Sequence, residues 1–392
     1  MIMRQRAGIV ARGTAVFAVV MLSTLVAAPA AHADDNVREL SWYLDAFKID
    51  QVHRITQGAG VVVAVIDSGV NANHRDLRGQ VLPGNGFGPG AGTDGRTDVD
   101  AEGSHGTSMA SIIAGKGGGP DHMLGIAPKA KILPVTVGAG GNAESSDALV
   151  DAIRWATKQK PDVMNLSIGT TAGGTADRAL LDAIGEAVRS DIVVVAGAGN
   201  SGDDVAETAK VPGVISVNAI DPDNEVSPLT NHGPSLAIAA PGAKIPVAVN
   251  RGATNYGYVA DAATSPATAM VSGVAALVRA RYPDLDAANV VNRLIKTATD
   301  RGQKGRDDSY GFGVVNPLAA LTADVAAVND NPLGTPAVAS TTPTSDTAAA
   351  AGGDPAEAGF PILVIAIVVA AVVVIALLAL GAFLVMRGRS RT

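Results

Sequence analysis

The strongest constraint on the fold of this chain is a run of short, wholly apolar segments that alternate with longer segments of helical periodicity. An unbroken apolar segment suits a strand of a parallel sheet that is covered on both faces. Such segments occupy residues 61–66, 132–137, 163–168, 192–196, 214–217 and 236–240. Helical periodicity appears at 146–159, 176–190, 267–281 and 286–299. The alternation predicts an α/β domain with a doubly wound parallel sheet and helices on both faces.

The N-terminal end has the pattern of a secretory signal peptide. Basic residues up to Arg12 precede an apolar stretch at 14–28, and Ala31-His32-Ala33 has the small-residue form that signal peptidases accept. We therefore predict a cleaved signal peptide over residues 1–33. A short N-terminal extension at 34–58 and the α/β domain at 59–322 would follow it.

The C-terminal end has the pattern of a membrane anchor. Residues 362–386 carry no charge and are long enough to span the hydrocarbon core of a bilayer. We predict a disordered Pro/Thr/Ala-rich linker at 323–359, a transmembrane helix at 360–386 and a basic tail at 387–392. Positively charged flanks stay in the cytoplasm. The predicted location is therefore the cytoplasmic membrane, crossed once, with the α/β domain outside and the tail inside.

Composition excludes several kinds of chemistry and one class of partner. The chain contains no cysteine, so it can form neither a disulfide nor a thiolate metal site, and it has no cysteine nucleophile. The net charge is −7 although both ends are basic, so the residues between them are more acidic than this total. An acidic domain repels phosphate backbones, and no nucleic acid is expected as a partner.

Three candidate catalytic residues lie where the predicted sheet would bring them together. Asp67 ends the first predicted strand, His105 opens an apolar helical segment, and Ser265 precedes the helix predicted at 267–281. Functional sites of open parallel sheets form at the carboxyl ends of the strands. Each residue alone also fits an ordinary role, as a turn residue, a helix-start histidine or an N-cap before proline. Their chain order Asp, His, Ser matches one class of hydrolytic triad.

The segments around these residues resemble the signatures of the subtilases, the subtilisin-like serine proteases. They read Asp67-Ser68-Gly69, His105-Gly106-Thr107-Ser108-Met109-Ala110 and Thr264-Ser265-Pro266-Ala267, and the resemblance covers roughly residues 42–322. It implies the subtilisin-like fold and a serine-type endopeptidase that cleaves proteins or peptides. In that enzyme Ser265 would attack the carbonyl, His105 would move the proton and Asp67 would orient the imidazole.

The same resemblance implies further site residues. Asn200, at the end of a predicted strand, would complete the oxyanion hole. The substrate-binding residues would be Ser167, Ile168, Gly169, Gly197, Ala198 and Gly199. Three positions near the nucleophile depart from the family pattern, namely Ala263, Pro266 and Ala269. None of these departures removes a catalytic group.

No cofactor and no metal ligand is predicted, but two alternatives need stating. The acidic loop 94–102 is interpreted as solvated, and a structural calcium ion bound there, as in many subtilases, is the alternative. Gly197-x-Gly199-x-x-Gly202 follows a strand, and Asp221 closes the next apolar segment, which resembles a dinucleotide fingerprint. That fingerprint requires a helix that opens at the glycines, and residues 203–210 are too short for one.

The order of the segments resembles the mycosins, the membrane-anchored subtilases of type VII secretion systems. This resemblance implies an endopeptidase at the outer face of the membrane, with the secretion machinery as a partner. Two alternatives remain open: a surface-anchored subtilase unrelated to secretion, and a weakly active or inactive protease that serves as a structural subunit. The extension at 34–58 is too short for a folded inhibitory prodomain, so activation by prodomain removal is not expected.

Overall fold

The computed structural model describes residues 37–101, 103–138, 146–168, 177–250 and 256–337. The predicted signal peptide, transmembrane helix and basic tail lie outside these ranges. Within them, no helix combines the length and the apolar character that crossing a bilayer requires.

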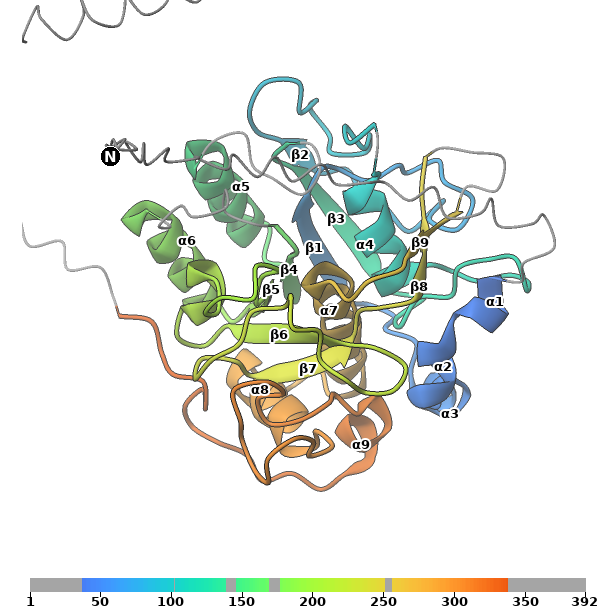
Figure 1. Ribbon diagram of the computed structural model, residues 1–392. Coiled ribbons are helices and arrows are strands. Elements are labelled where there is room, and N and C mark those ends of the chain that lie inside the picture. Colours follow the sequence, from blue (N-terminus) through green and yellow to red (C-terminus); the bar gives the residue numbers. More distant parts are fainter. Residues whose placement is uncertain (1–36, 102, 139–145, 169–176, 251–255, 338–392) are drawn as a thin grey trace, which may run out of the picture. The chain divides into compact units, whose positions relative to one another are not determined.

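A seven-stranded parallel sheet forms the centre of the described part (Figure 1), with its strands in the order β2-β3-β1-β4-β5-β6-β7. The strands are β1 Val62–Asp67, β2 Asn85–Gly86, β3 Lys131–Thr136, β4 Val163–Leu166, β5 Val193–Gly197, β6 Ile215–Ile220 and β7 Ile238–Pro241. All six predicted strands are confirmed. The sequence missed β2 because two residues carry no periodicity. The carboxyl ends of β1 and β4 flank the point where the strand order reverses, which is where such sheets place their sites.

Helices cover both faces of the sheet, as predicted. Alternate residues of β1 point to opposite faces, so Val63 and Val65 join one buried cluster and Ala64 and Ile66 join the other. The first face carries α4 His105–Ala114, α7 Thr264–Arg281, α8 Ala287–Lys296 and α9 Pro317–Thr322. The second face carries α5 Ser146–Lys158 and α6 Arg178–Arg189. A short antiparallel pair, β8 Ile245–Ala248 and β9 Tyr256–Val259, lies beside α4.

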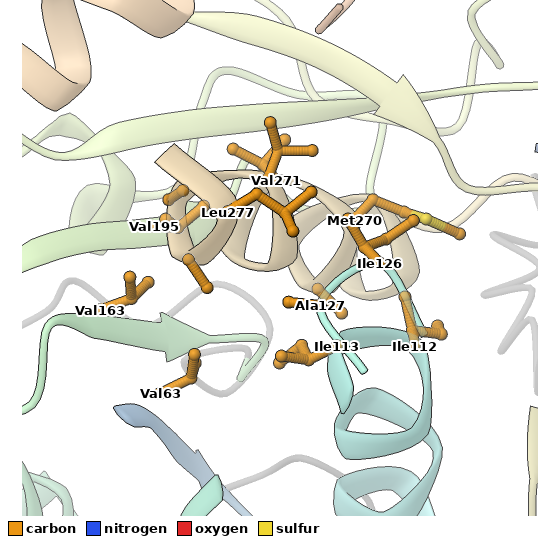
Figure 2. Close-up of a cluster of buried hydrophobic side chains, with 14 of the residues drawn as sticks. Val63, Ile112, Ile113, Ile126, Ala127, Val163, Val195, Met270, Val271 and Leu277 are labelled. Atoms are coloured by element: carbon orange, nitrogen blue, oxygen red, sulfur yellow. The ribbon is translucent and has the colours of Figure 1, made fainter. Parts of the chain in front are cut away.

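The helix α7 is buried along most of its length. Figure 2 shows Leu277 of α7 on the side of Val195 of β5, whereas Met270 of the same helix lies beside Ile126. The sequence placed the start of this helix at 267, whereas it begins at Thr264. The Ser-Pro pair therefore lies within the first turn, where the N–H that proline lacks would have no partner in the helix. This start places the hydroxyl of the candidate nucleophile at the N-terminal end of α7.

The predicted N-terminal extension forms part of the α/β body. It folds into α1 Val37–Leu40, α2 Trp42–Ala46 and α3 Ile49–Ile55. Tyr43, Leu44 and Val52 are almost completely buried in the same cluster as the sheet. The indole Nε1 of Trp42 donates to the carbonyl oxygen of Ala243 at 3.0 Å. The apolar side of this extension therefore packs into the same core as the sheet.

The described start of the predicted linker, up to residue 337, forms hydrogen bonds with the α/β body. Asn289 of α8 accepts a hydrogen bond from the N–H of Val328, and Asn331 donates to the carbonyl oxygen of Gly213. The guanidinium of Arg189 donates to the carbonyl oxygen of Ala337 at 2.9 Å. Side chains of the body thus bond the backbone of Val328 and Ala337, and Asn331 bonds the backbone of the body in return. Composition alone could not reveal these partners.

Candidate active site

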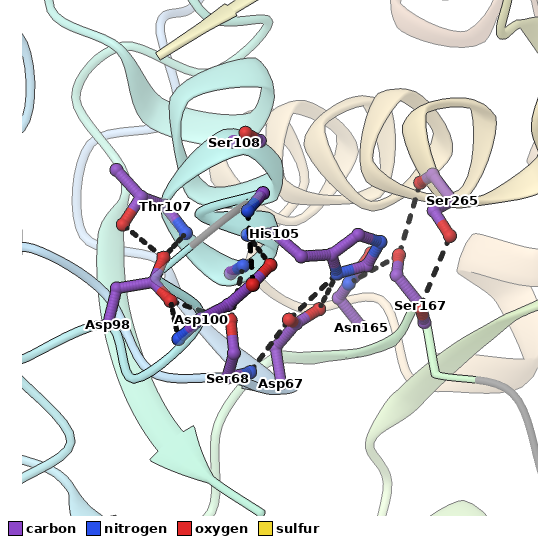
Figure 3. A network of polar contacts seen from close by, with 12 residues as sticks. Asp67, Ser68, Asp98, Asp100, His105, Thr107, Ser108, Asn165, Ser167 and Ser265 are labelled. Carbon is purple, nitrogen blue, oxygen red and sulfur yellow. Dashed lines mark hydrogen bonds and ion pairs between the residues drawn. The ribbon is translucent and has the colours of Figure 1, made fainter. Parts of the chain in front are cut away.

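The three candidate catalytic residues each stand at the end of a secondary-structure element. Asp67 is the last residue of β1, His105 is the first residue of α4, and Ser265 is the second residue of α7. In Figure 3 the imidazole of His105 extends from α4 across the Asp67 carboxylate toward the Ser265 end of α7. The fold therefore brings together the residues that the sequence singled out.

Asp67 and His105 form a close, well-oriented pair. The Nδ1 atom of His105 lies 2.8 Å and 2.9 Å from the two carboxylate oxygens of Asp67. The Asp67 side chain is fully buried, whereas 23% of the His105 side chain is exposed. The N–H of Ser68 also donates to Asp67 Oδ1 at 2.7 Å. A carboxylate only accepts, so Nδ1 carries the proton and Nε2 is left to act as a base.

The environment of His105 favours its protonated form. Desolvation by burial lowers the pKa of His105, but the charge of Asp67 and the hydrogen bond to it raise the pKa, and Asp98 and Asp100 add to this effect. The net result is a pKa above the ordinary value for histidine. A base with a raised pKa holds a captured proton more firmly until the leaving group takes it.

A second layer of hydrogen bonds supports this pair from the loop that precedes α4 (Figure 3). The hydroxyl of Ser68 donates to Asp98 at 2.8 Å and accepts from the N–H of Gly106 at 2.9 Å. The N–H and the hydroxyl of Thr107 both donate to Asp98, at 2.9 Å and 2.6 Å. Asp100 accepts from the N–H of His105 at 3.1 Å. These contacts tie β1, the loop and the first turn of α4 into one network.

The interpretation of 94–102 as a solvated acidic loop is wrong for two of its residues. Asp100 is buried and Asp98 is half-buried, because both carboxylates satisfy N–H groups at the start of α4. Burial raises the pKa of Asp98 to about 6, although hydrogen bonds from Thr107, Ser68 and Asp100 lower it. Among the described residues, no group of three or more His, Asp or Glu side chains is placed to hold a metal ion. Sequence analysis missed this network, because Asp98 and Ser68 are 30 residues apart and come into contact only in the fold.

Gly106 permits the close approach of α4 to β1. A Cβ atom at this position would lie 2.1 Å from the carbonyl oxygen of Gly69 and 3.2 Å from the Cβ atom of Asp67. Any side chain would therefore push the helix, and His105 with it, away from the strand. This steric requirement explains why a glycine follows the histidine in the sequence motif.

Ser265 forms a reciprocal contact with Ser167. The Ser265 hydroxyl donates to the carbonyl oxygen of Ser167 at 3.2 Å, and the Ser167 hydroxyl donates to the carbonyl oxygen of Ser265 at 3.1 Å. Asn165 links this pair to the body of α7, because it donates to the Ser167 hydroxyl and accepts from the hydroxyl of Ser272, both at 2.9 Å. The nucleophile candidate thus rests against the end of β4, and rotation about one side-chain bond turns its hydroxyl away from Ser167.

The departures from the family pattern are accommodated without strain. Ala263 has φ −134° and ψ 140°, an extended conformation open to any residue. Pro266 lies in the first turn of α7, and Ala269 is fully buried inside the helix. None of the three substitutions displaces Ser265 from the helix N-terminus.

Asn200 presents its amide nitrogen away from α7. Its side-chain oxygen accepts a hydrogen bond from the N–H of Thr264 at 2.9 Å. A backbone N–H only donates, so the oxygen must face Thr264 and the NH2 group remains to donate elsewhere. The residue is exposed, and it follows β5 just as Asp67 ends β1. A single contact therefore orients the amide beside the first turn of α7.

The predicted substrate-binding residues fall into two segments that follow β4 and β5. Ser167 and Ile168 come directly after β4, and Gly169 lies outside the described residues. Gly197 ends β5, and a Cβ atom there would lie 3.0 Å from the hydroxyl oxygen of Thr264, so its small size serves the packing of α7. Ala198 is fully buried, and its N–H donates to the carbonyl oxygen of Val217.

The dinucleotide alternative finds no support in this loop. After Gly202 the described chain makes one short 3-10 helix, Glu207–Lys210, rather than an α-helix that opens at the glycines. Without that helix there is no N-terminus to receive a pyrophosphate.

Comparisons with known proteins agree with this geometry. The model of the subtilase family matches residues 58–313. Subtilisin DY from Bacillus licheniformis is 36% identical over 67% of this chain and 92% of its own length. Mycosin-1 from Mycobacterium tuberculosis is 32% identical over 77% of each chain. The structure of the MycP3 protease from the type VII (ESX-3) secretion system has a TM-score of 0.64 and 31% identity, and the match covers 74% of this chain and 90% of that one. The chain therefore belongs to the subtilase family of serine endopeptidases and is related to the mycosins.

Proposed function

We propose that Asp67, His105 and Ser265 form the catalytic triad of a membrane-anchored serine endopeptidase that acts with a type VII secretion system. The observation that carries the triad is the double contact between His105 Nδ1 and the Asp67 carboxylate, at 2.8 Å and 2.9 Å. This contact fixes the tautomer that leaves Nε2 as a base on the side of α7.

The reaction begins when the Ser265 hydroxyl leaves the carbonyl oxygen of Ser167 and turns to His105. Nε2 takes the hydroxyl proton while Oγ bonds to the peptide carbonyl carbon, which gives a tetrahedral intermediate and an imidazolium. The imidazolium returns its proton to the leaving amine as the C–N bond breaks. Water then repeats the two proton transfers on the acyl-enzyme and releases the acid product.

Two hydrogen-bond donors and one helix dipole would stabilise the oxyanion of the tetrahedral intermediate. The amide of Asn200 is held with its NH2 group available, and the N–H of Ser265 lies in the first turn of α7, where helical N–H groups have no intrahelical partner. The positive end of the α7 dipole adds to their effect. Ser167, Ile168, Gly169, Gly197, Ala198 and Gly199 are assigned to substrate binding from the resemblance to the subtilases.

The cellular setting follows from the two ends of the chain and from the relatives. A signal peptide at 1–33 and a transmembrane helix at 360–386 place the enzyme outside the cytoplasmic membrane. The relationship to mycosin-1 and to proteases of type VII secretion systems supports secreted proteins as substrates and the secretion machinery as a partner. Copurification of secretion components with the full chain in detergent tests the partner.

The test of the activity uses the full chain in detergent and a chromogenic peptide. Ser265→Ala removes the nucleophile, and turnover is expected to fall to background. Ser111→Ala is a matched control, because Ser111 is a buried helical serine whose hydroxyl bonds Ser108 and Ala248 in α4 and β8. The control is expected to keep kcat within about 2-fold of the wild type. Undiminished cleavage by Ser265→Ala contradicts the proposal.

A further inference from the structure

The loop at 199–204 carries Asn200 but has no regular structure and little burial of its own. It follows β5, and most of its residues are exposed. An exposed loop with unpaired backbone groups would move, and a mobile Asn200 could not aim its amide at a developing charge. Some other part of the fold must therefore fix this loop.

One buried side chain bonds four polar groups of the loop. The Oδ1 atom of Asn231 accepts from the N–H of Ser201 at 2.9 Å, from the hydroxyl of Ser201 at 3.0 Å and from the N–H of Asp203 at 3.2 Å. Its Nδ2 atom donates to the carbonyl oxygen of Asp204 at 2.9 Å. Its backbone N–H donates to the carbonyl oxygen of Gly199 at 2.9 Å. Asn231 thus contacts the loop on both sides of Asn200.

The packing around Asn231 is as close as its hydrogen bonding. Its side chain is 6% exposed, and Gly199 has φ +110° with no room for a side chain, since a Cβ atom would lie 2.3 Å from Asn231 Nδ2. The neighbouring Leu229 also accepts from the N–H of Gly202 at 2.9 Å. The segment 229–231 therefore supplies the loop with hydrogen bonds that a helix or a strand would otherwise provide.

We propose that Asn231 is a positioning residue, which acts through the loop 199–204 to hold the carboxamide of Asn200 in the oxyanion hole. The inference rests on the proposed function. Asn200 is then held in two ways: Thr264 bonds its side-chain oxygen, and Asn231 bonds the backbone of its two neighbours, Gly199 and Ser201. Loss of Asn231 leaves the nucleophile and the histidine in place, but the carboxamide of Asn200 is no longer held in one position.

The test is a double-mutant cycle measured as kcat and KM with the full chain. Asn200→Ala is expected to lower kcat by about 10² to 10³-fold, the usual cost of one oxyanion donor. Asn231→Ala is expected to lower kcat by about 10 to 10²-fold, since a displacement of about 1 Å can have that effect, with KM within about 2-fold. In the Asn200→Ala background the same substitution is expected to change kcat by less than about 2-fold, because nothing remains for it to position.

A matched control separates positioning from stability. Asn292 is also a buried asparagine whose Nδ2 donates to a loop carbonyl oxygen, that of Ala326 at 3.0 Å. Asn292→Ala is expected to lower Tm without lowering kcat of the folded fraction. If Asn231→Ala does not fold, Asn231→Asp enters the cycle in its place. Aspartate keeps the three acceptor bonds but puts a carboxylate oxygen against the carbonyl oxygen of Asp204, which repels it. A loss of kcat is therefore expected, again confined to chains that retain Asn200.

The outcomes distinguish this inference from the proposed function. An active wild type in which the Asn231 variant keeps full kcat, or loses the same factor with and without Asn200, overturns the positioning role alone. A wild type without turnover, or a Ser265→Ala variant with full turnover, overturns both.

Discussion

The substitution Asp67→Asn probes the feature on which the proposed mechanism depends most, the tautomer of His105. Asparagine is close in size to the buried aspartate, and its oxygen can still accept from the N–H of Ser68, which lies 2.7 Å from Oδ1. Its NH2 group would then take the place of Oδ2 and face Nδ1 of His105, which lies 2.9 Å from Oδ2 in the wild type. A donor at that position forces Nδ1 to accept, so the proton moves to Nε2 and the base is lost.

The expected magnitude follows from this change of tautomer. In the type case of a serine protease, the same substitution lowers kcat by about 10⁴-fold, which corresponds to ~5 kcal/mol of barrier. The pH profile should move as well. The charge of Asp67 raises the pKa of His105 while desolvation lowers it, so without that charge the acid limb of kcat/KM shifts to lower pH.

The assay is steady-state hydrolysis of a chromogenic peptide between pH 5 and pH 10, with the folded fraction measured by thermal melting. The chain contains a matched control, since Asp76 is also fully buried and lies 2.5 Å from Nδ1 of a histidine, His122. Asp76→Asn is expected to lower Tm and to keep kcat. The reasoning is refuted if Asp67→Asn keeps kcat within about 10-fold of the wild type, or if Asp76→Asn loses as much activity.

Three further expectations concern the surroundings of the triad. In the wild type, kcat/KM should rise with pH through a pKa above the usual 6.5, because the raised pKa of His105 delays formation of the neutral base. Asp98→Asn removes a negative charge that helps to raise the pKa of His105, and it places an NH2 group or a weaker acceptor against Thr107. We therefore expect kcat to fall and the acid limb of the pH–rate profile to move to lower pH. Ala263→Gly should leave kcat unchanged and lower the free energy of unfolding by about 0.5–1 kcal/mol, measured by urea titration, because the extended backbone at this position needs no glycine.

Titration of His105 also links pH to stability. Its pKa in the folded chain lies above the value of an unfolded histidine, so folding takes up a proton near neutral pH. The contribution to the free energy of unfolding is present in full below the unfolded pKa of about 6.5 and is lost as pH rises through the folded pKa.

Periodicity could predict the sheet because it is a local signal, and motif order singled out the three candidate residues that the triad proposal uses. Each apolar segment found in the sequence became a strand, and Asp67 and His105 stand at element ends where the chain order suggested. The prediction for α7 missed its first turn because Ser265-Pro266 also fits a cap outside a helix.

The residues that the sequence could not reveal act across long separations. Asp98 looked like one acid in a solvated loop, and only the fold places it against Ser68 and Thr107. Asn231 lies in a turn with no catalytic signature, yet it reaches the loop of Asn200. The extension at 34–58 is predicted as a segment separate from the α/β domain, although Tyr43 is fully buried. In each case the contact joins residues of different segments, which local sequence patterns do not encode.

The most direct test of the triad is the site of covalent modification by a fluorophosphonate, which reacts with a hydroxyl only when a neighbouring base activates it. The full chain in detergent is labelled, and the adduct is located by peptide mapping with mass spectrometry. The triad predicts a single adduct on Ser265, absent from Ser265→Ala and formed far more slowly in His105→Ala. An adduct on another residue, or equal labelling of His105→Ala, contradicts it.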